Sequence, residues 1–82
     1  MNKTIFTKTH EHLIQQLRIA RIEKGLDQND VAKLLNKTQS YVSKIESGQR
    51  RVDIIQLMEF AKIYDKPLKY FINHIDGEQV LT

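Results

Sequence analysis

Apolar residues recur at intervals of three and four along most of the chain, which is the period of amphipathic α-helices. The first such segment follows Thr9, a suitable N-cap, and ends at Gly25. Its predicted inward side carries Leu13, Leu17 and Ala20, with Ile14 and Arg21 beside them. No segment shows the sustained period-two alternation that is typical of a strand. The pattern therefore predicts an all-α domain.

Two short helices are predicted next, with a tight turn between them. Asp27 is an expected N-cap for the first, and Asn36 is its expected stop. Thr38 caps the second, which runs until Gly48 supplies a left-handed position. The residues predicted to face inward from this pair are Val31, Ala32, Leu35, Val42 and Ile45.

Two more helices complete the predicted fold. Asp53 with Gln56 three residues later is typical of a capping box, and Asp65 with Lys66 ends that helix. Its predicted buried residues are Ile54, Leu57, Met58, Ala61 and Tyr64. Pro67 then opens a short fifth helix through Leu68, Phe71 and Ile72.

The caps also predict the domain boundaries: an N-terminal arm over residues 1–9, a helical domain over 10–73 and a C-terminal tail over 74–82. Several apolar residues in the arm and tail have no assigned place in the predicted core, and they either cover its ends or form a dimer contact. They are Ile5, Phe6, Ile75, Val80 and Leu81.

Composition narrows the function classes. A chain of 82 residues is one domain, too small for a large enclosed active site. It has no cysteine, so disulfides and thiolate metal sites are excluded and a reducing compartment is expected. His10 and His12, two residues apart, do not share a helix face and predict no metal site. No apolar run approaches the ~20 residues that cross a bilayer, so no membrane partner is expected.

Positive charge is concentrated in the middle of the chain. The formal net charge is +3. Between Arg18 and Arg51 there are eight basic and four acidic residues, a balance of +4, so the remainder sums to −1. This distribution favours a polyanionic partner.

Residues 28–45 have the residue types that a helix-turn-helix needs. Ala32 is small where the helix axes approach, Asn36 suits a positive φ in the turn, and Val42 with Ile45 anchors the second helix on the first. Further elements appear in order along the chain: Leu17-Arg18-x-x-Arg21-x-x-x-Gly25-Leu26, Gln28-x-x-Val31-Ala32, Tyr41-Val42-Ser43-Lys44-Ile45-Glu46-Ser47-Gly48 and Arg50-Arg51.

On these elements the chain, from Leu13 to about Phe71, resembles the Xre/Cro family of phage-repressor-like DNA-binding domains. The resemblance implies a compact, five-helix, lambda-repressor-like domain whose recognition helix, at 38–47, enters the major groove. Two departures are Asn36, where the family usually has Gly, and Arg51-Val52, where Asn-Pro is common.

The resemblance also implies roles for individual residues. Base contacts are expected from Thr38, Gln39, Ser40, Ser43 and Lys44, and phosphate contacts from Gln28, Lys37, Tyr41, Ser47, Arg50 and Arg51. For Tyr41, two arrangements are open: the hydroxyl meets a phosphate, or the ring lies over the groove edge. Arg21 and Glu46 are expected to form a structural ion pair.

The expected function is sequence-specific binding of double-stranded DNA by a transcriptional regulator, a repressor that binds a palindromic operator as a homodimer. Alternatives are an antitoxin or other protein-interaction module of the same fold, with a toxin or co-regulator as its partner, and a restriction-modification controller. No cofactor is expected. Because no nucleophile elbow, oxyanion hole or sizeable pocket is visible, the chain is not expected to be an enzyme. The expected location is the bacterial cytoplasm, at the nucleoid when bound.

Overall fold

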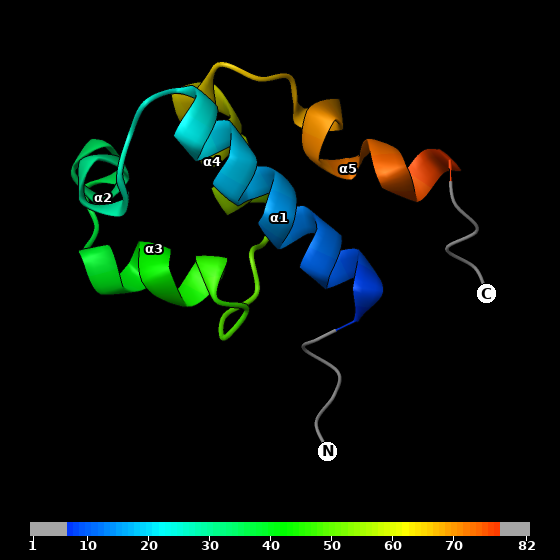
Figure 1. Cartoon of the computed structure of the whole chain (residues 1–82), viewed down its shortest axis with the longest axis horizontal. Helices are drawn as coiled ribbons and strands as arrows, with labels where there is room; N and C mark the ends of the chain where they lie inside the picture. Colours follow the sequence, from blue (N-terminus) through cyan, green and yellow to red (C-terminus); the bar gives the residue numbers. More distant parts are fainter. Residues whose placement is uncertain (1–6, 78–82) are drawn as a thin grey trace.

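Five α-helices follow one another in the computed structural model, which describes residues 7–77, with side chains to residue 73. They are α1 (Lys8–Glu23), α2 (Gln28–Leu35), α3 (Gln39–Glu46), α4 (Ile54–Tyr64) and α5 (Leu68–Gly77), with no strand in this part of the chain. In Figure 1, α2 and α3 lie at one end, α1 crosses in front of α4, and α5 lies at the other end. The predicted all-α, five-helix fold is confirmed.

Helix starts follow the predicted capping residues, with one exception. Asp27, Thr38 and Asp53 each accept a hydrogen bond from a backbone N–H three residues later, and both Asp residues form capping boxes. The exception is α1, which Thr7 caps with a 3.1 Å bond, so the predicted cap Thr9 lies inside the helix. Both positions hold threonine, and the helix begins at the earlier one.

Each of the first four helices is followed by a residue with positive φ. These residues are Gly25, Asn36, Gly48 and Asp65, with φ of 79°, 61°, 85° and 59°. After each, a backbone N–H reaches back five residues, as in the 2.8 Å bond from the N–H after Asn36 to the carbonyl of Ala32. This is the hydrogen-bond pattern of a Schellman motif, which satisfies carbonyls at the helix end. The predicted ends of these four helices are therefore confirmed.

The fifth helix is longer than predicted. It begins at Leu68, directly after Pro67, and continues to Gly77, so the first four residues of the predicted tail are helical. The physical reason is the absence of any glycine or proline between Pro67 and Gly77. The ends of the chain, 1–6 and 78–82, lie outside the described residues, so the expected arm and the end of the tail stay predictions.

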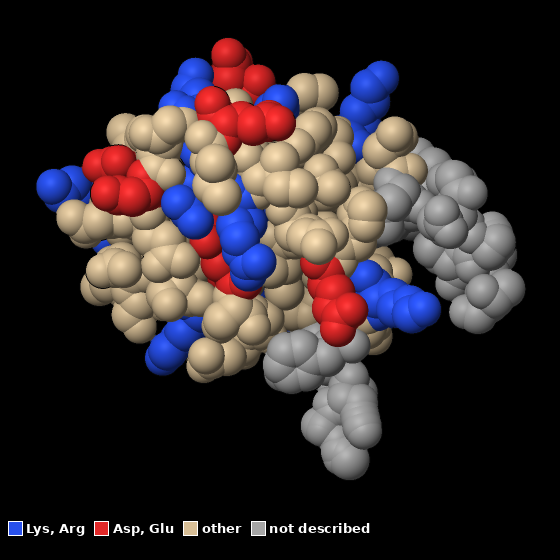
Figure 2. Space-filling model, in the orientation of Figure 1, with Lys and Arg blue, Asp and Glu red and all other residues tan. Residues whose placement is uncertain are grey.

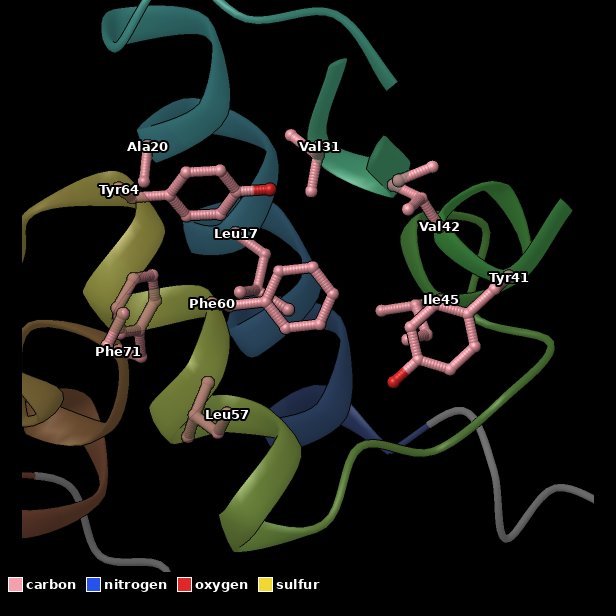
Figure 3. Close-up of a cluster of buried hydrophobic side chains, with 12 residues drawn as sticks. Leu17, Ala20, Val31, Tyr41, Val42, Ile45, Leu57, Phe60, Tyr64 and Phe71 are labelled. Atoms are coloured by element: carbon pink, nitrogen blue, oxygen red, sulfur yellow. The ribbon is translucent and has the colours of Figure 1, made fainter. Parts of the chain in front are cut away.

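One buried cluster draws on all five helices (Figure 3). It contains Leu17, Ala20, Val31, Ala32, Tyr41, Val42, Ile45, Leu57, Phe60, Ala61, Tyr64 and Phe71. For α4 the prediction was partly wrong, because Ile54 and Met58 are 53% and 52% exposed, while Phe60 is buried. The buried residues of α4 recur at the spacings of one helical face, which leaves Ile54 and Met58 on the other side. None of the helices within residues 7–77 is both long and apolar enough to cross a membrane.

Candidate nucleic-acid interface

The helix-turn-helix is formed by α2, a short turn and α3. These two helices pack against each other more extensively than any other pair. Ala32 of α2 is small, which lets the backbones approach, and it is 2% exposed, with Val31, Val42 and Ile45 fully buried around it. In Figure 1, α2 is seen almost end-on while α3 lies across the view, so the helices cross steeply. This packing leaves the opposite side of α3 available to a ligand.

That opposite side carries the five residues expected to read bases. Thr38, Gln39, Ser40 and Lys44 are exposed, and Ser43 is half-buried. Position 43 is four residues from 39 and three from 40, and position 44 is four residues from 40, so these positions neighbour one another on the helix surface. The Thr38 hydroxyl also caps α3 through a 3.2 Å bond from the backbone N–H of Tyr41. The structure therefore brings the expected residues to one surface.

A buried carboxylate supports this surface from beneath. Glu46 is 3% exposed and accepts bonds from Arg21 at 2.8 and 3.1 Å. The Arg21 guanidinium also donates to the carbonyl of Leu26 at 3.0 Å. The hydrogen bond with Glu46 raises the pKa of Arg21, although burial acts in the opposite direction. This is the ion pair that the sequence resemblance implied, and it ties α1 to the end of α3.

Gln28 connects this ion pair to the recognition helix. Its Nε2 donates to Glu46 at 3.0 Å, and its Oε1 accepts from Gln39 Nε2 at 3.3 Å. The role expected for Gln28 was a phosphate contact, and in this structure its amide bonds instead within the protein on both sides. Arg18, which has no predicted role, donates to the main-chain carbonyl of Glu46. Arg18 lies three residues before Arg21 on the same side of α1, and this spacing is the sequence signal that could have predicted the contact.

A shallow groove runs beside α3. Its lining contains three cations and no acidic side chain. The lining residues are Asn36, Lys37, Thr38, Ser40, Tyr41, Lys44 and Arg50. On the face shown in Figure 2, by contrast, basic and acidic residues are interspersed. The acid-free lining gives the groove the chemistry of an anion-binding surface.

The position of Tyr41 contradicts the expectation that its hydroxyl contacts a phosphate. The residue is 8% exposed, and its buried hydroxyl has no hydrogen-bond partner among the residues that the structure describes. Figure 3 shows the ring at the edge of the buried cluster, with the hydroxyl pointing inward. Burial raises the pKa of Tyr41 above its ordinary value. In this structure the hydroxyl therefore cannot meet a phosphate, because the surrounding protein covers it.

Comparison with known proteins agrees with this geometry. A family model described as helix-turn-helix, of the Xre-like type, matches residues 17–71, which is more than half of the chain. The chain belongs to the Xre-like helix-turn-helix family. A relative named HTH-type transcriptional regulator PrpR, from Mycobacterium tuberculosis, is 34% identical over 65 residues. The match covers 79% of this chain but only 13% of that protein, so the chain spans a small part of its relative.

The Xre-like turn is accommodated here by asparagine. Asn36 has φ 61° and ψ 44°, a left-handed conformation in which glycine is usual and asparagine is the next most suitable residue. After the C-terminal end of α3, Ser47 donates to the carbonyl of Lys44 at 3.2 Å, and Arg50 and Arg51 are exposed in the segment before α4. The departure at Arg51-Val52 therefore leaves two exposed arginines beside the recognition helix.

The histidines near the start of α1 show no sign of a metal centre. His10 is buried at 4% exposure, and the ring of His12 lies 3.5 Å from the Gln16 amide nitrogen. Within the described residues, no group of three or more His, Cys, Asp or Glu side chains could hold a metal ion.

Proposed function

We propose that this protein is a sequence-specific DNA-binding transcription regulator whose α3 enters the major groove. The observation that carries the proposal is the face of α3, where polar side chains stand exposed over a hydrogen-bonded support beside an acid-free groove. The name of the relative, a transcriptional regulator, supports the same reading. This role requires no catalysis or cofactor, and it places the protein with DNA in the bacterial cytoplasm.

Gln39 is suited to read adenine. Its amide nitrogen has two donor hydrogens, and one of them is used in the bond to Gln28. The other hydrogen and the amide oxygen remain for adenine N7 and N6. Lys44 can donate to guanine O6 and N7, and the Thr38 methyl can contact thymine. Ser40 and Ser43 discriminate less, because a hydroxyl both donates and accepts.

Phosphate contacts would supply most of the affinity. Lys37 and Arg50 line the groove, and Arg51 and Ser47 are exposed at the other end of α3. Such contacts release counterions from DNA, so binding weakens as salt rises. Gln28 stays a candidate phosphate contact only if its amide rearranges on binding.

An exposed apolar patch on α4 supports a homodimer. Ile54, Ile55 and Met58 are 53%, 61% and 52% exposed, and we call them the α4 patch. The occupant we propose is a second copy of this chain, because a two-fold interface pairs the same surface on both subunits. The patch begins three residues after Arg51, so pairing would bring two DNA-contacting surfaces together. Half-sites of a palindromic operator would then lie about 34 Å apart, and occupancy over a promoter would repress transcription.

Selection from a random duplex library tests the DNA-binding function. We expect the purified protein to enrich a palindromic motif at physiological salt. Gln39→Ala should cost about 1–3 kcal/mol at one base position, and Arg51→Ala should weaken all sequences alike and lower the salt slope by about one. Lys24→Ala, an exposed cation at the end of α1, is the matched control and should change neither. A retained pool without enrichment would contradict the proposal.

Sedimentation analysis tests the dimer separately. Wild-type protein should form a dimer, alone or on its selected duplex, and Ile55→Glu should yield monomers that bind a single half-site. A wild type that binds the palindrome strictly as independent monomers would refute the α4 patch as an interface. The antitoxin and restriction-modification alternatives share the DNA-binding surface and differ in their partner. Co-purification with a toxin encoded beside the gene would therefore favour the antitoxin alternative.

A further inference from the structure

The aromatic ring of Tyr41, and not its hydroxyl, makes the contacts on which this inference depends. Buried tyrosine hydroxyls usually find a hydrogen-bond partner, and a hydroxyl that is buried without one costs stability. Here the hydroxyl has no partner within the described residues. The contribution of Tyr41 to function must therefore come from its aromatic face.

Two cations lie against that face. Lys37 Nζ is 5.2 Å from the ring centroid, and Arg50 Cζ is 4.9 Å from it. Both distances are within the ~6 Å over which an aromatic ring attracts a cation. Lys37 precedes α3 and Arg50 follows it, so one ring gathers charges from both ends of the recognition helix.

These charges would otherwise repel each other. With Lys44 they form a groove lining that has three cations and no acidic side chain. The negative face of the ring offsets part of this repulsion and restricts two long, flexible side chains. A ligand that carries negative charge then meets cations that are already in place, and less conformational entropy is lost when it binds.

We propose that Tyr41 is a positioning residue whose buried ring holds Lys37 and Arg50 ready to bind phosphate groups of the DNA backbone. The inference rests on the proposed DNA-binding function and adds to it a residue that touches no DNA itself. The aromatic face is required, and the hydroxyl is dispensable.

Two substitutions in the full chain separate ring from hydroxyl. Tyr41→Phe keeps the aromatic face, and its affinity for the selected duplex should stay within about twofold of wild type. Tyr41→Leu keeps an apolar side chain without the face, and its affinity should fall by about fivefold on every duplex. Base preference should not change, because phosphates carry no sequence information. Equal losses in both variants would overturn the proposal.

A double-mutant cycle distinguishes positioning from a general weakening of the fold. In the Tyr41→Leu background, Lys37→Ala and Arg50→Ala should each cost less affinity than they do in wild type. Lys44 is the matched control: it lines the same groove, but among the described residues its ammonium group makes no cation–π contact with the ring. Lys44→Ala should cost the same in both backgrounds. Full additivity for Lys37 and Arg50 would refute the positioning role.

Proton NMR of the free protein provides a test that does not involve DNA. Methylene protons of Lys37 and Arg50 close to an aromatic face should be shifted upfield in wild type and Tyr41→Phe, and this shift should disappear in Tyr41→Leu. Unshifted protons in wild type would refute the positioning role of the Tyr41 ring even if DNA binding is strong. A wild type with shifted protons that enriches no DNA would instead show that the proposed function has failed, and the phosphate-binding role with it.

Discussion

Glu46→Ala removes the acceptor of three side-chain hydrogen bonds beneath the recognition helix. Two come from Arg21 at 2.8 and 3.1 Å, and one comes from Gln28 at 3.0 Å. The carboxylate side chain is 3% exposed and the Arg21 side chain is 14% exposed, so water has little access to replace these bonds. The substitution leaves a largely buried guanidinium without its counter-charge.

The expected cost follows from this geometry. Breaking a buried ion pair by removing one partner costs about 3–5 kcal/mol. Arg21 keeps its bond to the carbonyl of Leu26 and some contact with solvent, which favours the lower end, about 3 kcal/mol. A domain of this length has a free energy of unfolding on the order of 4–12 kcal/mol. The melting temperature should therefore fall by about 12 °C or more.

Urea unfolding followed by far-ultraviolet circular dichroism measures this loss. The control is the double variant Arg21→Met/Glu46→Leu, which removes both charges and fills a similar volume. It should recover at least half of the lost stability, because no uncompensated buried charge remains. A loss under about 1 kcal/mol for Glu46→Ala, or a double variant as unstable as the single one, would refute the reasoning.

Three further predictions concern stability. Asn36→Ala should cost about 1 kcal/mol in urea unfolding and Asn36→Gly should be close to neutral, because residue 36 has φ 61°; equal losses would exclude backbone strain as the cause. Asp53→Ala should cost about 1 kcal/mol and should not add fully to Gln56→Ala, because the two side chains form one capping box with bonds of 2.7 and 2.9 Å; additive losses would argue against that coupling. Burial raises the pKa of Tyr64 and of Tyr41 above that of an unfolded tyrosine, about 10. The unfolded state therefore loses its protons first, so the free energy of unfolding should fall as pH rises above about 10, and Tyr64→Phe should reduce this slope.

Local signals were enough to predict the order of the helices and most of their ends. Asp27, Thr38 and Asp53 act as caps through bonds to backbone groups three residues away, and Gly48 ends α3 with a left-handed conformation. Interactions of this range depend little on the rest of the fold, so their residues can be recognised in the sequence. At Thr7 and Thr9 the signal was ambiguous, because two equivalent caps stand two residues apart.

No short-range signal in the sequence identifies which face of α4 is buried. Apolar residues occur on nearly all sides of that helix, so its sequence alone does not say which side faces the core. The packing of the other helices selects the face with Phe60 and leaves Ile54 and Met58 exposed. The same limit applies to Tyr41, whose position at the edge of a face allowed its hydroxyl to point either outward or inward.

The helix-turn-helix, its left-handed turn at Asn36 and the polar residues on the recognition helix could be predicted from the amino-acid order, because each follows from a short-range pattern. The contacts that support these residues could be found only in the folded chain. Gln28 and Glu46 are 18 positions apart, and Lys37 and Arg50 converge on one ring from opposite ends of α3. Contacts of this kind depend on how helices pack, and packing is a property of the whole chain.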